Sequence, residues 1–83
     1  MEGKLVGRIS HYFSKIGVAV VELNADLKVG DTIAIVGKAG RVEQPVTEMQ
    51  VDRAAIKAAS SGQSVGLKVG GRVHEGDSVF KVS

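Results

Sequence analysis

The sequence predicts an all-β fold, which we expect to be a small closed antiparallel β-barrel of about six strands. Short runs rich in Val and Ile recur along the chain, and turn-forming residues separate them. Gly occurs 11 times and Pro once, which favours strands and tight turns. A chain of 83 residues can bury one modest core, so a single domain is expected over residues 1–83. Closure is favoured because it removes the exposed edges of a small sheet.

Three strands are predicted in the first half of the chain. Residues 4–9 are interpreted as a strand, and residues 18–23 (VAVVEL) form a β-branched run typical of a strand buried on much of both faces. Residues 11–15 (HYFSK) connect them and carry two of the three aromatic side chains. The third strand is predicted at residues 31–36 (DTIAIV), followed by a hairpin turn at residues 37–40 (GKAG).

The second half of the chain continues with short strands. Residues 41–51 (RVEQPVTEMQV) alternate in polarity, although Pro45 indicates an opening or bulge within this strand. Residues 52–62 are interpreted as an extended stretch or loop rather than a helical turn. Two more strands are predicted at residues 64–69 (SVGLKV) and 77–82 (DSVFKV). The positions expected to share one core are Ile33, Ile35, Val65, Leu67 and Val79.

One turn-then-strand phrase occurs three times, beginning at Gly30, Gly62 and Gly76. Each Gly precedes Asp or Gln, then a hydroxyl residue, then a β-branched residue. Unequal spacing excludes a tandem repeat. We interpret the phrase as a strand-initiating turn, in which Gly reverses the chain and the Asp or Gln side chain accepts hydrogen bonds from turn amides. A metal site built from these side chains is less favoured, because Gln is a poor third ligand.

Composition excludes several classes of site. The absence of Cys excludes disulfides, thiol nucleophiles and thiolate metal sites. His11 and His74 are far apart in sequence and lack the spacing of a metal site. No catalytic set of residues emerges from the sequence, so we expect neither an enzyme nor a cofactor. The net charge is +2, and the cations are scattered rather than clustered.

The order of the motifs resembles the second domain of translational GTPases, the Greek-key barrel of elongation factor Tu. The segments that carry the resemblance are LKVGDTIAIVG (27–37), VTEM (46–49), AASSGQSVGLKVGG (58–71) and VHEGDSVF (73–80). It extends over about residues 6–82 and looks closest to small stand-alone translation elongation factor-like proteins, which share HYFSKIGVAVVEL (11–23). The chain is similar, more loosely, to the barrel at the C-terminus of some collagenase-like peptidases.

The resemblance implies a binding module associated with RNA, either tRNA or the ribosome. GTP binding is not expected, because no G-x-x-x-x-G-K-[ST] loop occurs. In elongation factor Tu a Glu of the matching segment lies against the terminal adenine of tRNA, and Glu48 stands at that position here. The family's Arg three residues later is replaced by Val51, and Arg53 lies two residues beyond.

The predicted ligand surface combines aromatic rings, which stack on bases, with cations that hold phosphate. Its candidate residues are His11, Tyr12, Phe13, Lys15, Glu48 and Arg53. Two alternatives stay open: Tyr12 or Phe13 plugs the end of the barrel, and Glu48 is an ordinary solvated strand residue. The alternative function is a protein-interaction or assembly module without a nucleic-acid role. We expect a cytoplasmic location and no membrane contact, because no signal peptide or long apolar segment is present.

Overall fold

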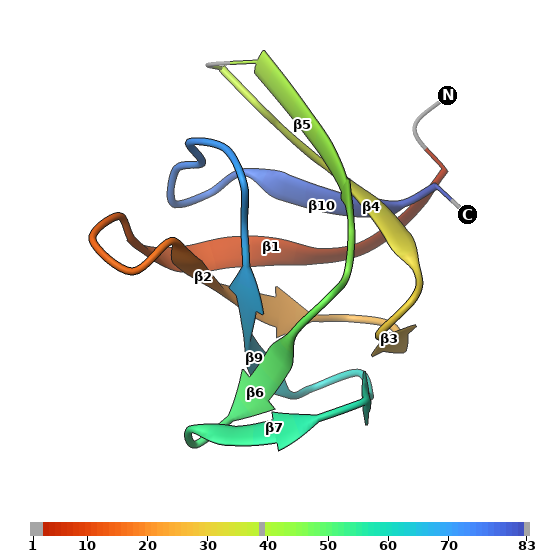
Figure 1. Ribbon diagram of the computed structural model, residues 1–83. Helices are drawn as coiled ribbons and strands as arrows, with labels where there is room; N and C mark the ends of the chain where they lie inside the picture. The colour runs from red at the N-terminus through yellow and green to blue at the C-terminus, as the bar shows by residue number, and fades with distance from the viewer. Residues whose placement is uncertain (1–2, 39, 83) are drawn as a thin grey trace.

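The computed structural model describes residues 3–38 and 40–82, which form ten β-strands and no helix (Figure 1). In chain order the strands are β1 (Lys4–Phe13), β2 (Val18–Leu23), β3 (Leu27–Lys28), β4 (Thr32–Gly37), β5 (Gly40–Pro45), β6 (Met49–Val51), β7 (Ala54–Ile56), β8 (Ala58–Ala59), β9 (Ser64–Lys68) and β10 (Ser78–Lys81). Ala39, in the predicted hairpin turn GKAG, lies outside the described residues. Within the described part there is no helix long and apolar enough to span a membrane.

Eight strands form one antiparallel sheet in the order β5-β4-β10-β1-β2-β9-β6-β7, and β3 pairs with β8 in a second, two-stranded sheet. The expected all-β antiparallel class is therefore confirmed. The expected closed barrel of about six strands is wrong, because the ladder ends at β5 on one side and at β7 on the other. The predicted strand 41–51 is divided between β5 and β6, which lie in different parts of this sheet. Pro45 ends β5 and has no N–H to extend a ladder.

The side chain of Gln44 joins β5 to the end of β9 and the segment after it, which do not pair as strands. The Gln44 amide Nε2 donates to the carbonyl of Lys68, and its Oε1 accepts from the N–H of Gly70, each at 2.8 Å. Gly71 lies against Val42, so that a Cβ added at Gly71 would be 2.9 Å from Val42 Cγ2. The edge strand β5 is thus held to the segment after β9 by a Gln amide and a close contact instead of a strand pair.

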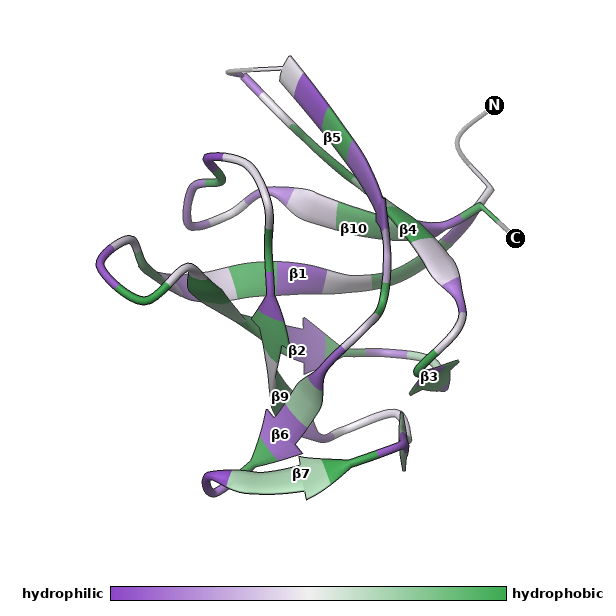
Figure 2. Ribbon diagram, in the orientation of Figure 1, coloured by the Kyte–Doolittle hydropathy of each residue, from purple (hydrophilic) through white to green (hydrophobic). Residues whose placement is uncertain are grey.

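The sheet curls around one apolar core (Figure 2). The predicted core positions are confirmed, since each exposes no more than 1% of its surface: Ile33, Ile35, Val65, Leu67 and Val79. Inward residues alternate with outward ones along β2 and β9, as expected of strands with one buried face. Other large side chains of the core are Val6, Ile9, Leu27 and Met49.

The three copies of the repeated phrase form the same turn, over residues 28–31, 60–63 and 74–77. In each, the N–H of the fourth residue donates to the carbonyl of the first, at 3.1 to 3.2 Å. The Gly in third place has a φ of 102°, 93° or 91°, which an L side chain rarely adopts. The side-chain oxygen of the fourth residue accepts from the N–H of the first, at 3.0, 2.7 and 2.9 Å. The interpretation of the phrase as a strand-initiating turn is confirmed.

The strand β1 extends further than predicted and is irregular. It continues to Phe13, so that the aromatic residues assigned to a loop belong to a strand. Its pairing with β2 shifts between Ile9 and His11, where one extra residue enters β1. A one-residue shift moves every later side chain to the opposite face of a strand. The shift therefore decides which aromatic side chain of β1 meets the core.

Candidate binding surface

Tyr12 and Phe13 lie on opposite faces of β1. Tyr12 is half-buried and packs against the core, and its hydroxyl lies 3.5 Å from the carbonyl oxygen of Gly71. These contacts make Tyr12 a cover of the core, although the open sheet has no barrel end for it to plug. Phe13 points outward and exposes 51% of its surface, with its ring centroid 6.2 Å from that of His11.

An apolar hollow opens on the outer face of β1, β2 and β9, beside the tip of the β1–β2 hairpin. Its volume is about 350 Å³, and we call it the outer hollow. The residues that line it include Phe13, Ile16, Val18, Val20, Arg53 and Gly66. Phe13 and Ile16 are the most exposed of its large apolar side chains, and Figure 2 shows hydrophobic residues near the hairpin tip. A half-buried strand normally carries polar side chains on its outer face, so this surface is unusual.

Gly66 forms the floor of the outer hollow. A Cβ added there would lie 3.4 Å from Val18 Cγ1 and 3.4 Å from Gln50 Cγ. The hollow exists because three neighbouring strands place a Gly between larger side chains: Val20 of β2 pairs with Gly66, and Gly66 pairs with Gln50 of β6.

Three cations stand around this surface. Lys68 pairs with Val18 across β9 and β2, and its Nζ donates to the carbonyl of Ile16 at 3.3 Å. Lys15 lines a shallow neighbouring hollow together with Phe13 and Ile16. Arg53 lines the outer hollow from the β6–β7 turn.

The β6–β7 turn that carries Arg53 has an unusual backbone. Asp52 and Arg53 both have positive φ, 51° and 67°, in a two-residue loop between the paired Val51 and Ala54. Such loops favour Asn-Gly because both central residues need positive φ. An Arg there is held in a conformation that few L residues adopt.

Not all of the predicted ligand residues come together. Phe13 and Arg53 line the outer hollow. Glu48 and Arg53 line a second hollow of about 430 Å³, so Arg53 stands between the two. His11 neighbours Phe13 but lines neither hollow, and its Nδ1 lies 3.2 Å from Glu75 Oε2 in an exposed pair. Sequence reasoning missed Ile16, Val18, Val20 and Gly66, although the run VAVVEL, apolar on both faces, was a signal that the outer face is apolar too.

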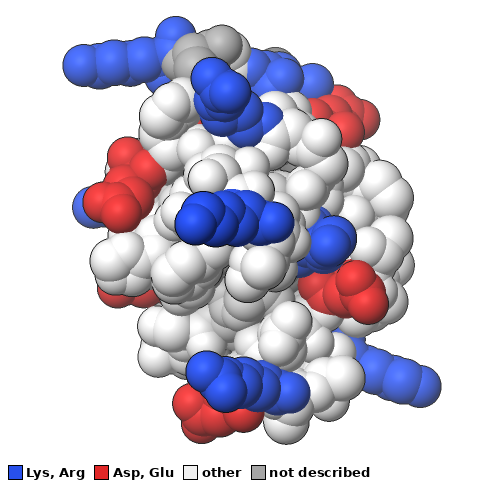
Figure 3. Space-filling model, turned by 60° about the vertical axis from the view of Figure 1, so that its left-hand side comes forward, with Lys and Arg blue, Asp and Glu red and all other residues white. Residues whose placement is uncertain are grey.

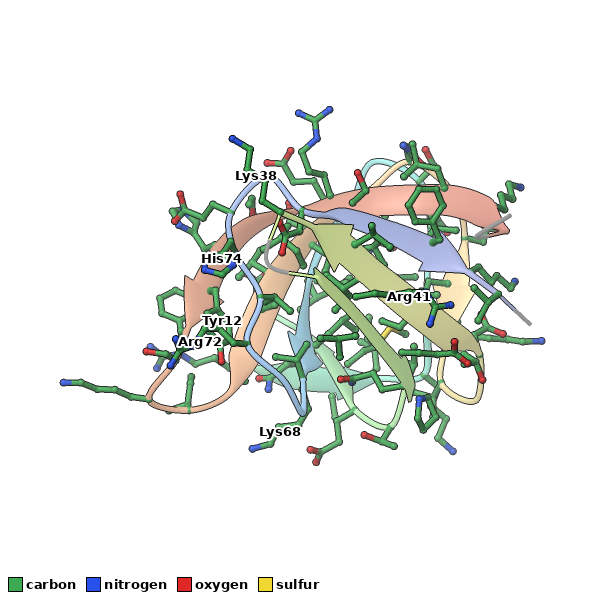
Figure 4. All side chains as sticks on the ribbon, turned by 90° about the horizontal axis from the view of Figure 1, so that it is seen from above. Tyr12, Lys38, Arg41, Lys68, Arg72 and His74 are labelled. Atoms are coloured by element: carbon green, nitrogen blue, oxygen red, sulfur yellow. The ribbon has the colours of Figure 1, made fainter. Side chains whose placement is uncertain are left out.

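Basic side chains from several elements lie along one end of the molecule. Figure 4 shows Lys38, His74, Tyr12, Arg72 and Lys68 along one end of the molecule, with Arg41 set apart from them. A hollow of about 790 Å³ lies there, and Lys38, His74 and Asp77 are among the residues that line it. Asp77 already accepts the hydrogen bond of its own turn. Among residues 3–38 and 40–82, no group of three or more His, Cys, Asp or Glu side chains could hold a metal ion.

Comparison with known proteins links the chain to peptidases. An uncharacterized protease of Methanocaldococcus jannaschii is 43% identical over 76 residues, which cover 90% of this chain and 19% of that protein. A collagenase of Porphyromonas gingivalis is 32% identical over 78 residues, which cover 92% of this chain and 22% of the collagenase. The chain thus spans about a fifth of the length of these curated relatives. No protein-family model matches it.

Solved structures show the same fold. Two crystal structures of the C-terminal domain of a putative U32 peptidase of Geobacillus thermoleovorans superpose with TM-scores of 0.89 and 0.88. Each is 20% identical in sequence, and the match covers 94% of this chain and 99% or 91% of that domain.

These findings correct three expectations. The elongation factor-like assignment is wrong, because the relatives are a protease and a collagenase and the matching structures are peptidase domains. The expected association with RNA or translation is wrong for the same reason. The expectation that the chain is not an enzyme is also wrong as stated, because the chain matches part of proteins named for proteolysis. The looser resemblance to the C-terminal barrel of collagenase-like peptidases is the one that the comparisons support.

Proposed function

We propose that the chain serves proteolysis as the counterpart of the C-terminal domain of U32-type peptidases, and that it holds polypeptide for the peptidase. The observation that carries this proposal is the extent of the match. The relatives named for proteolysis align with at least 90% of this chain, whereas it covers about a fifth of their length. A domain that matches about a fifth of a peptidase suits a supporting role in proteolysis.

The outer hollow supports the second part of the proposal. Exposed apolar side chains on a sheet face, with cations around them, are typical of a surface that receives another chain. A protein partner is therefore proposed. The cytoplasmic location and the single domain over residues 1–83 stay predictions.

A domain exchange tests the proposed function. Three forms of the Porphyromonas gingivalis collagenase would be compared: the intact protein, a form without the 78 matched residues, and a form with this chain in their place. We expect the deletion to slow the cleavage of labelled gelatin by roughly tenfold, the effect of losing about 1.4 kcal/mol of substrate binding. The exchange form should recover most of this loss.

A short quenched peptide is the matched control substrate, because it is too small to reach a separate docking surface. Its cleavage should change little among the three forms. The proposal is contradicted if the exchange form is folded by circular dichroism and yet cleaves gelatin no faster than the deletion form.

A further inference from the structure

We infer that the outer hollow docks an extended polypeptide segment in which apolar side chains are flanked by acidic residues. This inference rests on the proposed function and deepens it, because it names the kind of segment that the peptidase system would present.

The shape of the outer hollow fits an apolar anchor. Phe13 and Ile16 expose 51% and 60% of their surfaces, while Val18 and Val20 are half-buried between them and Gly66. Most larger residues at position 66 would fill the floor, because a Cβ alone already reaches Val18 and Gln50 at 3.4 Å. The volume of about 350 Å³ lies at the small end of ligand pockets, so one or two apolar side chains of an extended segment fit it better than a folded domain.

The charges around the outer hollow select the residues on either side of the anchor. Lys15, Lys68 and Arg53 stand around the exposed apolar residues, and Asp52 is the only acidic residue among those described that lines the hollow. Figure 3 shows Lys and Arg through the middle of one face, with an uncharged area between them and most Asp and Glu towards its sides. Opposite charges steer association and set register, so acidic residues that flank an apolar anchor match this pattern.

The backbone at Arg53 supports a binding role for its side chain. A φ of 67° at Arg and 51° at Asp costs stability relative to the Asn-Gly pair that suits such a turn. Backbone strain of this kind concentrates at sites of ligand contact. Arg53 lines both the outer hollow and the second hollow, which Glu48 also lines.

Binding of synthetic peptides to this chain tests the inference. The probe is a fluorescein-labelled hexapeptide with a central Leu-Phe pair and two acidic residues on each side. One matched peptide carries Lys in place of the acidic residues, and another carries Ser-Ser in place of Leu-Phe. We expect the acidic apolar probe to bind with a Kd on the order of 10⁻⁴ to 10⁻⁵ M, and both matched peptides to bind at least roughly tenfold more weakly. Binding should weaken as salt rises.

Variants locate the site. The double substitution Phe13→Ser and Ile16→Ser should weaken probe binding by roughly tenfold or more, and Arg53→Gln by roughly threefold to tenfold. Leu5→Ser is the matched control, because Leu5 is 46% exposed and does not line the hollow. Backbone NMR shifts on addition of the probe should concentrate at Phe13, Ile16, Gly66 and Arg53.

Several outcomes would overturn the inference. These are equal binding of the Lys peptide, an equal loss in Leu5→Ser, or no localised shifts at millimolar probe. Shifts of the same residues that depend on protein concentration without peptide would assign the hollow to a second copy of the chain. Because this experiment reads peptide binding and the domain exchange reads proteolysis, failure of one is distinguishable from failure of the other.

Discussion

The three strand-initiating turns and the two hairpin tips beside the outer hollow use their side chains in opposite ways. In the turns 28–31, 60–63 and 74–77, the Asp or Gln oxygen accepts a hydrogen bond from an amide three residues earlier, so the side chain serves its own turn. At the β1–β2 tip, Phe13 and Ile16 extend into solvent. At the β6–β7 tip, Arg53 occupies a conformation that the turn alone would give to Gly.

This difference separates residues that build the fold from residues that the fold does not need. A polar motif that recurs in sequence attracts attention as a site, yet each copy here is satisfied locally. The hairpin tips share no motif, but they carry exposed apolar side chains and two residues with positive φ. The comparison can be tested by substitutions in both regions, which should change stability in the first and binding in the second.

The largest loss of stability is expected from substitution of Asp31 in the turn 28–31. Asp31 is 6% exposed, accepts from the N–H of Lys28 at 3.0 Å and lies 3.4 Å from the Nζ of Lys81. Asp31→Ala should lower the free energy of unfolding by about 1–3 kcal/mol, because the Lys28 amide loses its acceptor at a partly buried hydrogen bond and Lys81 loses its charged partner. Gln63→Ala removes the same hydrogen bond at an exposed turn and should cost less than about 1 kcal/mol.

Urea unfolding of both variants, followed by circular dichroism, measures these losses. Asp31→Asn keeps an acceptor and removes only the charge, so its loss should lie between those of the two Ala variants. Equal losses in Asp31→Ala and Gln63→Ala would show that burial of the turn has no part in its stability.

A smaller loss of stability is expected when a Gly with positive φ in these turns is replaced by Ala. Gly62 has a φ of 93° and open space around a would-be Cβ, so Gly62→Ala should cost about 1 kcal/mol from conformation alone. Gly70 is the matched control, because its φ is not positive and an added Cβ would lie 3.8 Å from Gln44 Oε1. Gly70→Ala should change stability by less than about 0.5 kcal/mol in the same urea unfolding assay. A larger loss at Gly70 than at Gly62 would contradict this account of the turns.

Hydrophobic alternation was enough to predict the class of the fold and its core. Ile33, Ile35, Val65 and Leu67 belong to strands in which each inward residue is apolar, so period two identified them. Whether the sheet closes into a barrel was not predictable in this way. It depends on how the chain divides after Pro45 and on the Gln44 amide that substitutes for strand pairing, which are features of tertiary contact.

The candidate site was predictable only in part. Phe13 and Arg53 were selected for their chemistry, and both line the outer hollow. The extra residue in β1 between Ile9 and His11 sends Tyr12 inward and Phe13 outward, and one-residue shifts of this kind leave no clear sequence signal. Gly66 becomes a floor only because three strands meet there. The likeness to elongation factors misled about function because folds are shared by proteins with unrelated roles.

The smallest change in the free energy of unfolding is expected from substitution at the β6–β7 tip, where the chain should become more stable instead of less. The double substitution Asp52→Asn and Arg53→Gly gives this turn the residues that positive φ at both positions favours. We expect the free energy of unfolding to rise by about 0.5–1 kcal/mol, because the strain disappears while the paired Val51 and Ala54 are unchanged.

The same double variant should bind the acidic apolar peptide more weakly, because the Arg53 side chain is lost from the lining of the outer hollow. Asp52→Asn alone is the control, since it keeps Arg53 in place; because it removes a negative charge from the lining of the hollow, it should bind the acidic peptide at least as tightly as the parent chain. Urea unfolding and fluorescence anisotropy on the same samples measure the two quantities. A double variant that is less stable than the parent chain, or that binds the peptide equally well, would remove the distinction between the residues that build this fold and those at its hairpin tips.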